Sequence, residues 1–381
     1  MLMKSFILLA AVAAFVSCSS KAQEQTVSSG SELKFSVNVF RNALRQSAPD
    51  ADVTVSPYSA GVALSMLMEG AEGQTRTELD NALGGCLFRQ SDLGDGDTVT
   101  VKSANSLWIN DDFSVRNTYV DALSKEYGAF ADVMNFSDPA TVNAINNWCS
   151  ENTAGMIKGV VSKLTPDMVM ILANALYFKA PWEKPFNPAA TADDIFHGSK
   201  GDAEVPFMNG TLNCGYVEYA GNTLVAIPYE GGKYSMYILL PSKELGVNGV
   251  VSYLTESGLD GIMPHIKDTR LKLSMPKFKV ESEMSLVKTL EAMGVRTAFT
   301  SAADLSGIAR GPLAVSDVFQ KAVVDVDENG SEAAAVTTIT VSLTSARIDP
   351  LPVVTVDRPF LYMIADVEAE RILFAGRIMN I

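Results

Sequence analysis

The sequence predicts an α+β fold with several long strands and most of its helices in the first half. Val169–Phe178 is a continuous apolar run broken only by Asn174, which is typical of a central strand buried on both faces. Helical spacing of apolar residues dominates before this run, and strand-like runs dominate after it. With 47% hydrophobic residues and no Gly/Ser/Pro-rich linker, the chain is expected to bury one large core.

The first half begins with an amphipathic helix, because the apolar residues from Leu33 to Leu44 follow helical spacing. Val53–Val55 is predicted as a short strand. Ser56 then offers a capping hydroxyl and Pro57 suits a first helical position, so a second helix starts here and ends at Gly70 and Gly73. The elements expected next are a strand at 99–109 and helices at Thr118–Tyr127 and Val142–Glu151.

The second half is predicted to consist mainly of strands. Asn174, on the central strand, needs several hydrogen-bond partners if it is buried. The later elements expected are strands at Leu224–Tyr229, Tyr234–Leu240, Leu271–Met275 and Lys277–Val280, a helix at Met284–Met293, an extended run at Leu313–Val326, and paired strands at Val353–Ala365 and Arg371–Met379.

The charge balance is acidic. A formal net charge of −14 and a pI of about 4.7 make nucleic acid and polyanions such as heparin poor partners.

The N-terminus carries an export signal, since residues 1–17 have a basic start and a short apolar run. Phe15-Val16-Ser17-Cys18 resembles a bacterial lipobox, which predicts lipidation of Cys18 and a tether over residues 18–31. The alternative is ordinary cleavage after Ala22. We expect an exported protein, held by its lipid on the bacterial outer membrane or cell surface, or otherwise secreted as an extracellular protein.

Three cysteines remain beyond Cys18, namely Cys86, Cys149 and Cys214. They show no CxxC spacing and cannot all pair, which predicts buried free thiols instead of a disulfide framework or a zinc site.

An unusual stretch lies between Asp325 and Pro359. A polar cluster ends at Glu332, and the fourteen residues Ala333–Ala346 that follow contain no charge, proline or glycine. Apolar residues alternate along this run with a period of two, which is typical of a strand with one buried face. Such a strand is prone to edge pairing, so it either lies in a sheet already or is built to enter one.

No catalytic constellation is recognisable, and an enzyme is not predicted. The chain has only two histidines, His197 and His265, and lacks the common hydrolase, metalloprotease and nucleotide-binding motifs. The run Asp325-x-Asp327-x-Asn329-Gly330 fits the first half of an EF-hand calcium-binding loop. Val336, however, stands at the twelfth position, where a bidentate Glu is needed. We therefore expect no metal and no cofactor.

Residues from about 30 to 381 resemble the serpins, the serine protease inhibitor family. The segments that carry the resemblance are, in chain order, Val55–Ser59 with the helix to Gly73, Asn174–Trp182, Pro185-Phe186, Thr191, Phe196, Pro276–Phe278, Leu290, Met293–Val295, Phe299, Asp304–Ile308, Glu328–Ala335, Arg358–Phe360 and Leu373–Arg377.

The resemblance implies a single serpin domain over 32–381, with a large central mixed sheet, about eight to nine helices and an exposed reactive-centre loop at about 328–352. A serpin offers this loop as bait, and after acyl-enzyme formation the cut loop enters the central sheet as a new strand and distorts the protease. The implied site residues are a hinge (Glu328, Gly330, Ser331, Ala333, Ala334, Ala335), a shutter (Ser56, Ser59, Asn174, Gln320) and a breach (Trp182). Gln320 stands where the family has a histidine, and its amide cannot titrate.

Small hinge residues favour an inhibitor, because charged or bulky residues cannot slip into a sheet. The alternative is a non-inhibitory serpin that acts as a carrier or a chaperone-like surface protein. The family spacing of sixteen residues beyond Glu328 puts the reactive bond at Thr344–Ser345, and Leu343, Arg347 and Ile348 are alternatives. We expect a monomer that traps an elastase- or subtilisin-like serine protease, with trypsin-like and cysteine proteases as further candidates.

Overall fold

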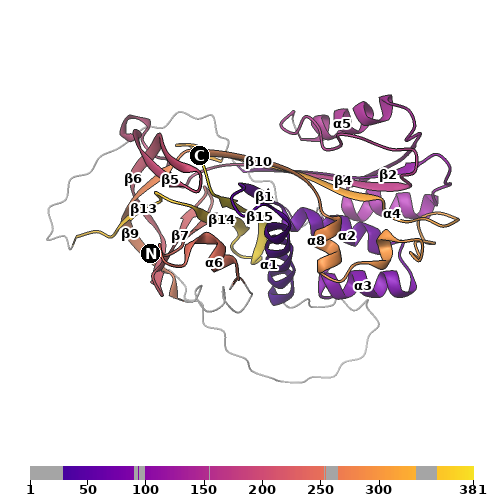
Figure 1. The fold of residues 1–381 in the computed structure, drawn as a ribbon, viewed down its shortest axis with the longest axis horizontal. Helices are drawn as coiled ribbons and strands as arrows, with labels where there is room; N and C mark the ends of the chain where they lie inside the picture. The colour runs from indigo at the N-terminus through magenta and orange to yellow at the C-terminus, as the bar shows by residue number, and fades with distance from the viewer. Residues whose placement is uncertain are drawn as a thin grey trace, which may run out of the picture.

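The computed structural model describes residues 29–89, 93, 99–153, 155–252, 254, 265–331 and 350–381. Within these ranges the chain forms two β-sheets and seven α-helices around a large apolar core (Figure 1). None of the helices in the described ranges is long and apolar enough to cross a membrane. The helices are α1 (Ser29–Gln46), α2 (Pro57–Met68), α3 (Gly73–Leu83), α4 (Asn117–Tyr127), α5 (Ala140–Asn152), α6 (Gly246–Ser252) and α8 (Val287–Ala292), with short 3-10 turns at Pro188–Ala190 and Thr297–Phe299.

The central sheet has six strands in the order β10-β11-β12-β4-β2-β3. Its middle strand β4 is buried almost throughout, as its apolar sequence requires. The N-terminal half of β4, from Ile171 to Leu176, also pairs directly with β11, in parallel. The strands are β2 (Thr100–Asn110), β3 (Phe130–Met134), β4 (Met170–Pro181), β10 (Phe278–Ser285), β11 (Asp317–Val326) and β12 (Gly330–Ser331).

The second sheet has nine strands, in the order β1-β15-β14-β8-β7-β6-β9-β13, with β5 paired to β6. It lies at one end of the central sheet, on the left in Figure 1. The strands are β1 (Val53–Val55), β5 (Ala192–Gly198), β6 (Gly201–Tyr219), β7 (Asn222–Pro228), β8 (Tyr234–Leu240), β9 (Lys267–Pro276), β13 (Val353–Thr355), β14 (Phe360–Asp366) and β15 (Arg371–Ile378).

Helices cover both faces of the central sheet. In Figure 1, α5 lies above the sheet while α2 and α4 lie below it. Beneath α5, Trp108 of β2 and Ile171 of β4 form an apolar cluster with Ile145 and Cys149 of the helix. On the other side every residue of α2 is buried, because this helix is apolar nearly all round.

The fold class and most elements expected from the sequence are confirmed, including the Ser56 cap, whose side chain accepts a hydrogen bond from the Ser59 backbone N–H. Four predictions were wrong in detail. The strand expected at Val353–Ala365 is divided into β13, which pairs with β9, and β14, which pairs with β15. The second helix ends at Met68, and Gly73 begins α3 instead of closing α2. The helix expected at Met284–Met293 is shorter, because β10 continues to Ser285. The described residues contain seven α-helices, fewer than the eight to nine expected.

Candidate functional site

The central sheet is open at one end, between β4 and β11. The two strands pair in parallel from Asp317 opposite Ile171 to Ala322 opposite Leu176. Beyond that point they separate, and the two residues of β12 lie between them. Ser331 pairs with Ala180 of β4 and with Val326 of β11, so the start of the bait segment is already a strand of the sheet.

Gly330 fits this opening because it has no side chain. A Cβ at this position would lie 2.1 Å from the carbonyl oxygen of Ala180 and 2.7 Å from the Cα of Pro181. Both are backbone atoms of β4 and cannot move aside without disturbing the sheet. The close approach of two backbones therefore requires glycine here.

Trp182 closes the end of the opening. Its indole N–H donates to the carbonyl oxygen of Asp327 at 3.0 Å, and its backbone N–H donates to the carbonyl oxygen of Asn329 at 2.8 Å. The indole stacks on Tyr229, with ring centroids 4.5 Å apart and an interplanar angle of 11°. The hydroxyl of Tyr229 lies 2.6 Å from that of Ser331, and both residues are buried. These contacts hold the turn before β12 against the end of β4.

Glu328 fastens the same turn to the second sheet. Lys277 Nζ lies 2.9 Å from its Oε2, and the Thr191 hydroxyl donates to its Oε1 at 2.8 Å. Burial alone would raise the pKa of Glu328, but hydrogen bonds from Lys277, its own backbone and Thr191, together with the lysine charge, hold that pKa below its ordinary value. The side chain is therefore a buried carboxylate near neutral pH.

Ser56 and Gln320 form a second cluster deeper in the sheet. The Ser56 backbone N–H donates to Gln320 Oε1 at 2.8 Å, and Gln320 Nε2 donates to the Ser56 carbonyl oxygen at 2.9 Å. The Ser56 hydroxyl donates to the Leu373 carbonyl oxygen at 2.7 Å. A single amide side chain thus satisfies two backbone groups at the start of α2 and ties β11 to that helix.

Asn174 sits next to this cluster, opposite Gln320 on β11 and Asn105 on β2. Its amide N–H donates to Asn105 Oδ1, and the Asn105 amide donates to the Ser103 hydroxyl at 2.9 Å. In the described part of the chain, the Asn174 side-chain oxygen and the Ser59 hydroxyl have no hydrogen-bond partner. The polar network expected around Asn174 is therefore present, although it is incomplete.

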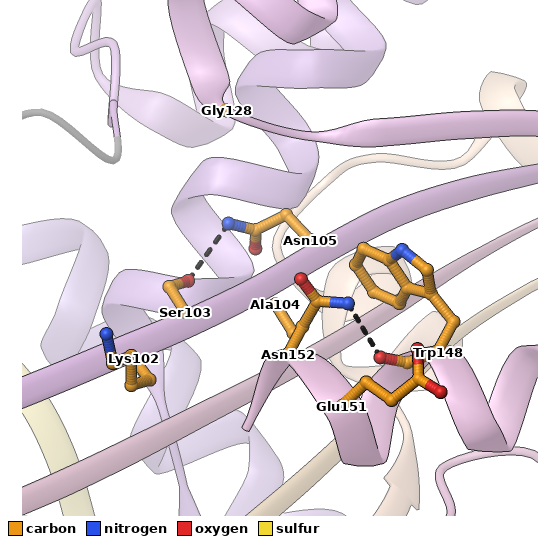
Figure 2. Close-up of a pocket in the computed structure, with 8 residues that line it drawn as sticks. All are labelled: Lys102, Ser103, Ala104, Asn105, Gly128, Trp148, Glu151 and Asn152. Atoms are coloured by element: carbon orange, nitrogen blue, oxygen red, sulfur yellow. Dashed lines mark hydrogen bonds between the residues drawn. The ribbon is translucent and has the colours of Figure 1, made fainter. Parts of the chain in front are cut away.

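A cavity of about 320 Å³ lies beside this network, between β2 and the C-terminal turn of α5 (Figure 2). Asn105 and Ser103 line it from the strand, and Trp148 and Asn152 line it from the helix. β3 pairs with β2 only from Ser106 onward, so among the described residues no strand flanks the first part of β2 on the side away from β4. The cavity marks the free edge of the sheet next to the shutter.

The three cysteines of the described residues are not activated. Cys86, Cys149 and Cys214 are free and buried, and burial raises the pKa of Cys149 to about 12 and that of Cys214 to about 11. Thiols of this kind are inert near neutral pH. Asp325 pairs with Lys279 at 3.0 Å, and Asp327 Oδ1 accepts the backbone N–H groups of Asn329 and Gly330.

The structure gathers the predicted residues into two groups. Glu328, Gly330 and Ser331 meet Trp182 at the open end of the sheet, while Ser56, Ser59, Asn174 and Gln320 lie deeper in it. Sequence reasoning gave no role to Tyr229, Lys277 or Asn105. The expected hinge residues Ala333, Ala334 and Ala335, the reactive-bond candidates Leu343, Thr344, Ser345, Arg347 and Ile348, and Cys18 lie outside the described residues.

Comparisons with known proteins agree with this architecture. The family model described as Serpin (serine protease inhibitor) matches residues 31–381. An uncharacterized serpin-like protein of Thermococcus kodakarensis is 34% identical over 345 residues, which cover 86% of this chain and 80% of the relative. The native state of tengpin, a thermophilic serpin, superposes with a TM-score of 0.86 at 29% identity over 96% of both chains. Human thyroxine-binding globulin in complex with thyroxine superposes with a TM-score of 0.83 at 25% identity, over 92% of this chain and 98% of the globulin.

The chain therefore belongs to the serpin family. Serpins are generally inhibitors that target proteases, and they are not catalytic enzymes. The comparisons do not support the expected bacterial source or the expected lipid anchor.

Proposed function

We propose that the protein is a suicide-substrate inhibitor of serine proteases. The observation that supports this most is the position of Gly330 and Ser331 between β4 and β11. Ser331 already pairs with both β4 and β11, so a strand that continues from it begins in register and enters the sheet once the direct β4–β11 pairing from Asp317 to Ala322 opens. In this proposal, cleavage of the loop frees residues 332–344 to extend β12 along the whole length of β4.

The free energy available supports the proposal. About ten additional ladder hydrogen bonds contribute about 1 kcal/mol each. Burial of Ile339, Val341 and Leu343 contributes about 1.5–3 kcal/mol per side chain. These gains offset the cost of ordering the inserted residues, which is about 1–2 kcal/mol each. In this proposal the surplus is the free energy that acts on a captured protease, and it remains as extra stability of the cleaved protein.

The reactive bond in this proposal is Thr344–Ser345, which follows Leu343. A small, uncharged residue before the cleaved bond suits elastase- or subtilisin-like serine proteases. Leu343, Arg347 and Ile348 are the alternative positions, and Arg347 is the only one that suits a trypsin-like enzyme.

The proposed cellular location of the inhibitor rests on its N-terminal sequence. A signal peptide over residues 1–17 directs export, and lipidation of Cys18 anchors the protein to a bacterial envelope. Cleavage after Ala22 gives a secreted protein instead. We propose that it acts there as a monomer.

A carrier function is the second candidate, because thyroxine-binding globulin superposes on this chain almost as well as tengpin does. The fold alone does not separate the two functions. The hinge favours inhibition, since Gly330 and Ser331 are followed by Ala333, Ala334 and Ala335, which are small enough to enter the sheet.

The experiment is incubation with a panel of elastase-, subtilisin- and trypsin-like proteases, followed by gel electrophoresis in SDS. An inhibitor gives a covalent complex that survives boiling, and mass spectrometry of the released peptide locates the cut bond. Clean turnover of the loop by every protease, without complex, contradicts the proposal.

A further inference from the structure

The chain that follows the proposed bait segment returns to the second sheet beside β9. β13 pairs with β9 in parallel, with Val353 opposite Lys272 and Thr355 opposite Ser274. The backbone N–H of Lys272 donates to the carbonyl oxygen of Pro352 at 2.9 Å. β9 is therefore fixed directly to the end of the loop, and β13 and β9 lie together at the left of Figure 1.

β9 presents cations on its outer face. Leu271 and Leu273 are buried, so the alternating residues Arg270 and Lys272 face solvent, and both are exposed. Lys184 lies on the other side of β6 from β9, where its Nζ donates at 2.7 Å to the carbonyl oxygen of Thr211, the β6 residue opposite Lys272. In the described chain, no acidic residue forms a salt bridge with any of the three.

These cations are opposite in sign to the formal net charge of the whole molecule, which is −14. Asp268 is the next outward residue of β9, at the end away from β13, and Glu183 adjoins Lys184 in the chain. Hence the positive charge concentrates at the end of β9 that holds the loop. Since screening limits charge effects to about 8 Å at physiological salt, this local sign decides what can lie against β9.

A protease bound to the loop covers this surface. From Ser345 to Pro352 the chain can span at most about 25 Å even when fully extended. A protease domain of about 230 residues has a radius of gyration of about 17 Å, so its width exceeds that reach. An enzyme attacking Thr344–Ser345 is therefore brought within contact distance of Lys272 and Arg270.

We propose that Arg270 and Lys272 on the outer face of β9 form a docking surface for an acidic patch on the target protease, beside its active-site cleft. This rests on the proposed inhibitory function and specifies its partner. The cations orient the approaching protease and raise its association rate, because charges at the rim of an interface act mainly on association. This recognition is added to that of the bait sequence. Among proteases that accept the same bond, the protein then prefers those with an acidic rim.

The test uses one protease in two charge states: native pancreatic elastase and elastase succinylated on its lysines, matched by activity on a small peptide. Arg270→Glu/Lys272→Glu reverses the two cations on β9. The matched control is Lys288→Glu/Arg310→Glu, which changes the net charge equally at exposed positions away from β9. Comparing these two variants removes the effect of total charge.

With succinylated elastase, the β9 variant should associate about five- to tenfold more slowly than the control variant, and the difference should shrink as salt is added. With native elastase the β9 variant should not be slower. Equal association rates of the two variants with succinylated elastase overturn the proposal. If the association rates are equal and only the β9 variant loses heparin binding, the proposal is also overturned. The two cations would then be a binding site for a polyanion.

The measurement stays informative if inhibition fails. Docking precedes both trapping and simple cleavage, so kcat/KM for loop cleavage reports the same contact when no SDS-stable complex forms. Slower cleavage of the β9 variant then supports the docking surface while the inhibitory function alone is refuted.

Discussion

The hydroxyl groups of Tyr229 and Ser331 lie 2.6 Å apart in the buried end of the central sheet, 102 residues apart in the chain. Tyr229 also stacks on Trp182, whose indole donates to the backbone just before the hinge. Burial raises the pKa of the Tyr229 phenol, which keeps its proton. Ser331, one of the two hinge residues already in the sheet, is thus held by a side chain that directly follows β7 of the second sheet.

Tyr229→Phe should destabilise the protein by about 1–3 kcal/mol, because it leaves the buried Ser331 hydroxyl without its partner. The phenyl ring keeps the stack on Trp182. Urea unfolding of this variant, of Ser331→Ala and of the double variant gives the coupling energy between the two groups. A coupling energy near zero would mean that the contact does not hold the hinge.

Ser331→Arg should turn the inhibitor into a substrate. Ser331 is 2% exposed between β4 and β11, and an arginine there cannot be buried without a charged partner. The expected result is loss of the SDS-stable complex with retained cleavage of the loop. Ser331→Thr keeps a small hydroxyl and serves as the control. Unchanged inhibition by the arginine variant would show that the hinge is wrongly assigned.

Glu328→Gln should lower stability at pH 7 by about 1–3 kcal/mol, because the buried carboxylate loses its charged bond to Lys277. The folded-state pKa of Glu328 lies below the unfolded value near 4.5, so the carboxylate stabilises the folded state above that pH. This contribution is lost as pH falls through the folded-state pKa. The gap in urea midpoint between wild type and variant should therefore close below about pH 4.5.

A suitable control for Glu328 is Asp325→Asn, since Asp325 forms an exposed pair with Lys279 at 3.0 Å. Exposed pairs of this kind contribute about 0–1 kcal/mol. A gap between wild type and Glu328→Gln that stays constant from pH 7 to pH 3 would exclude the carboxylate as its cause.

Gln320→Ala should cost about 1–3 kcal/mol, because it leaves the buried N–H of Ser56 unsatisfied, while the Ser56 carbonyl oxygen keeps the Ala60 N–H as a donor. Gln74→Ala, which removes an exposed amide bonded to Glu78, should cost less than about 0.5 kcal/mol. Thermal and urea unfolding measure both. A loss no larger than that of the control would mean that water replaces the Gln320 amide.

Local sequence signals were enough for elements whose pattern is self-contained. The Ser56 hydroxyl and Pro57 predicted the start of α2, and the apolar run around Asn174 predicted β4. α3 was missed because Gly73 was interpreted as a helix end, although Thr75, Leu79 and Leu83 follow helical spacing and are buried. Glycine is far more common just after a helix than at its start, so the local signal at Gly73 pointed to the wrong end of a helix.

Features that depend on distant pairing could not be predicted. β6 runs for 19 residues through Pro206, Gly210 and Gly215, which read locally as breaks, and it is held as a strand by β9 and its other neighbours. Tyr229 precedes a Glu-Gly-Gly turn and gives no local sign that it meets Ser331. The same holds for Lys277 and Glu328, which meet only because two sheets converge.

The central claim is that the cleaved loop becomes a full strand between β4 and β11. The measurement that tests it most directly is the melting temperature of the protein before and after a protease cuts the loop. Insertion should raise the melting temperature of the cleaved protein, by about 1–2 °C for each kcal/mol of net stability gained in a domain of this length. A cleaved protein that melts at the same temperature as the intact one would contradict insertion and favour the carrier function.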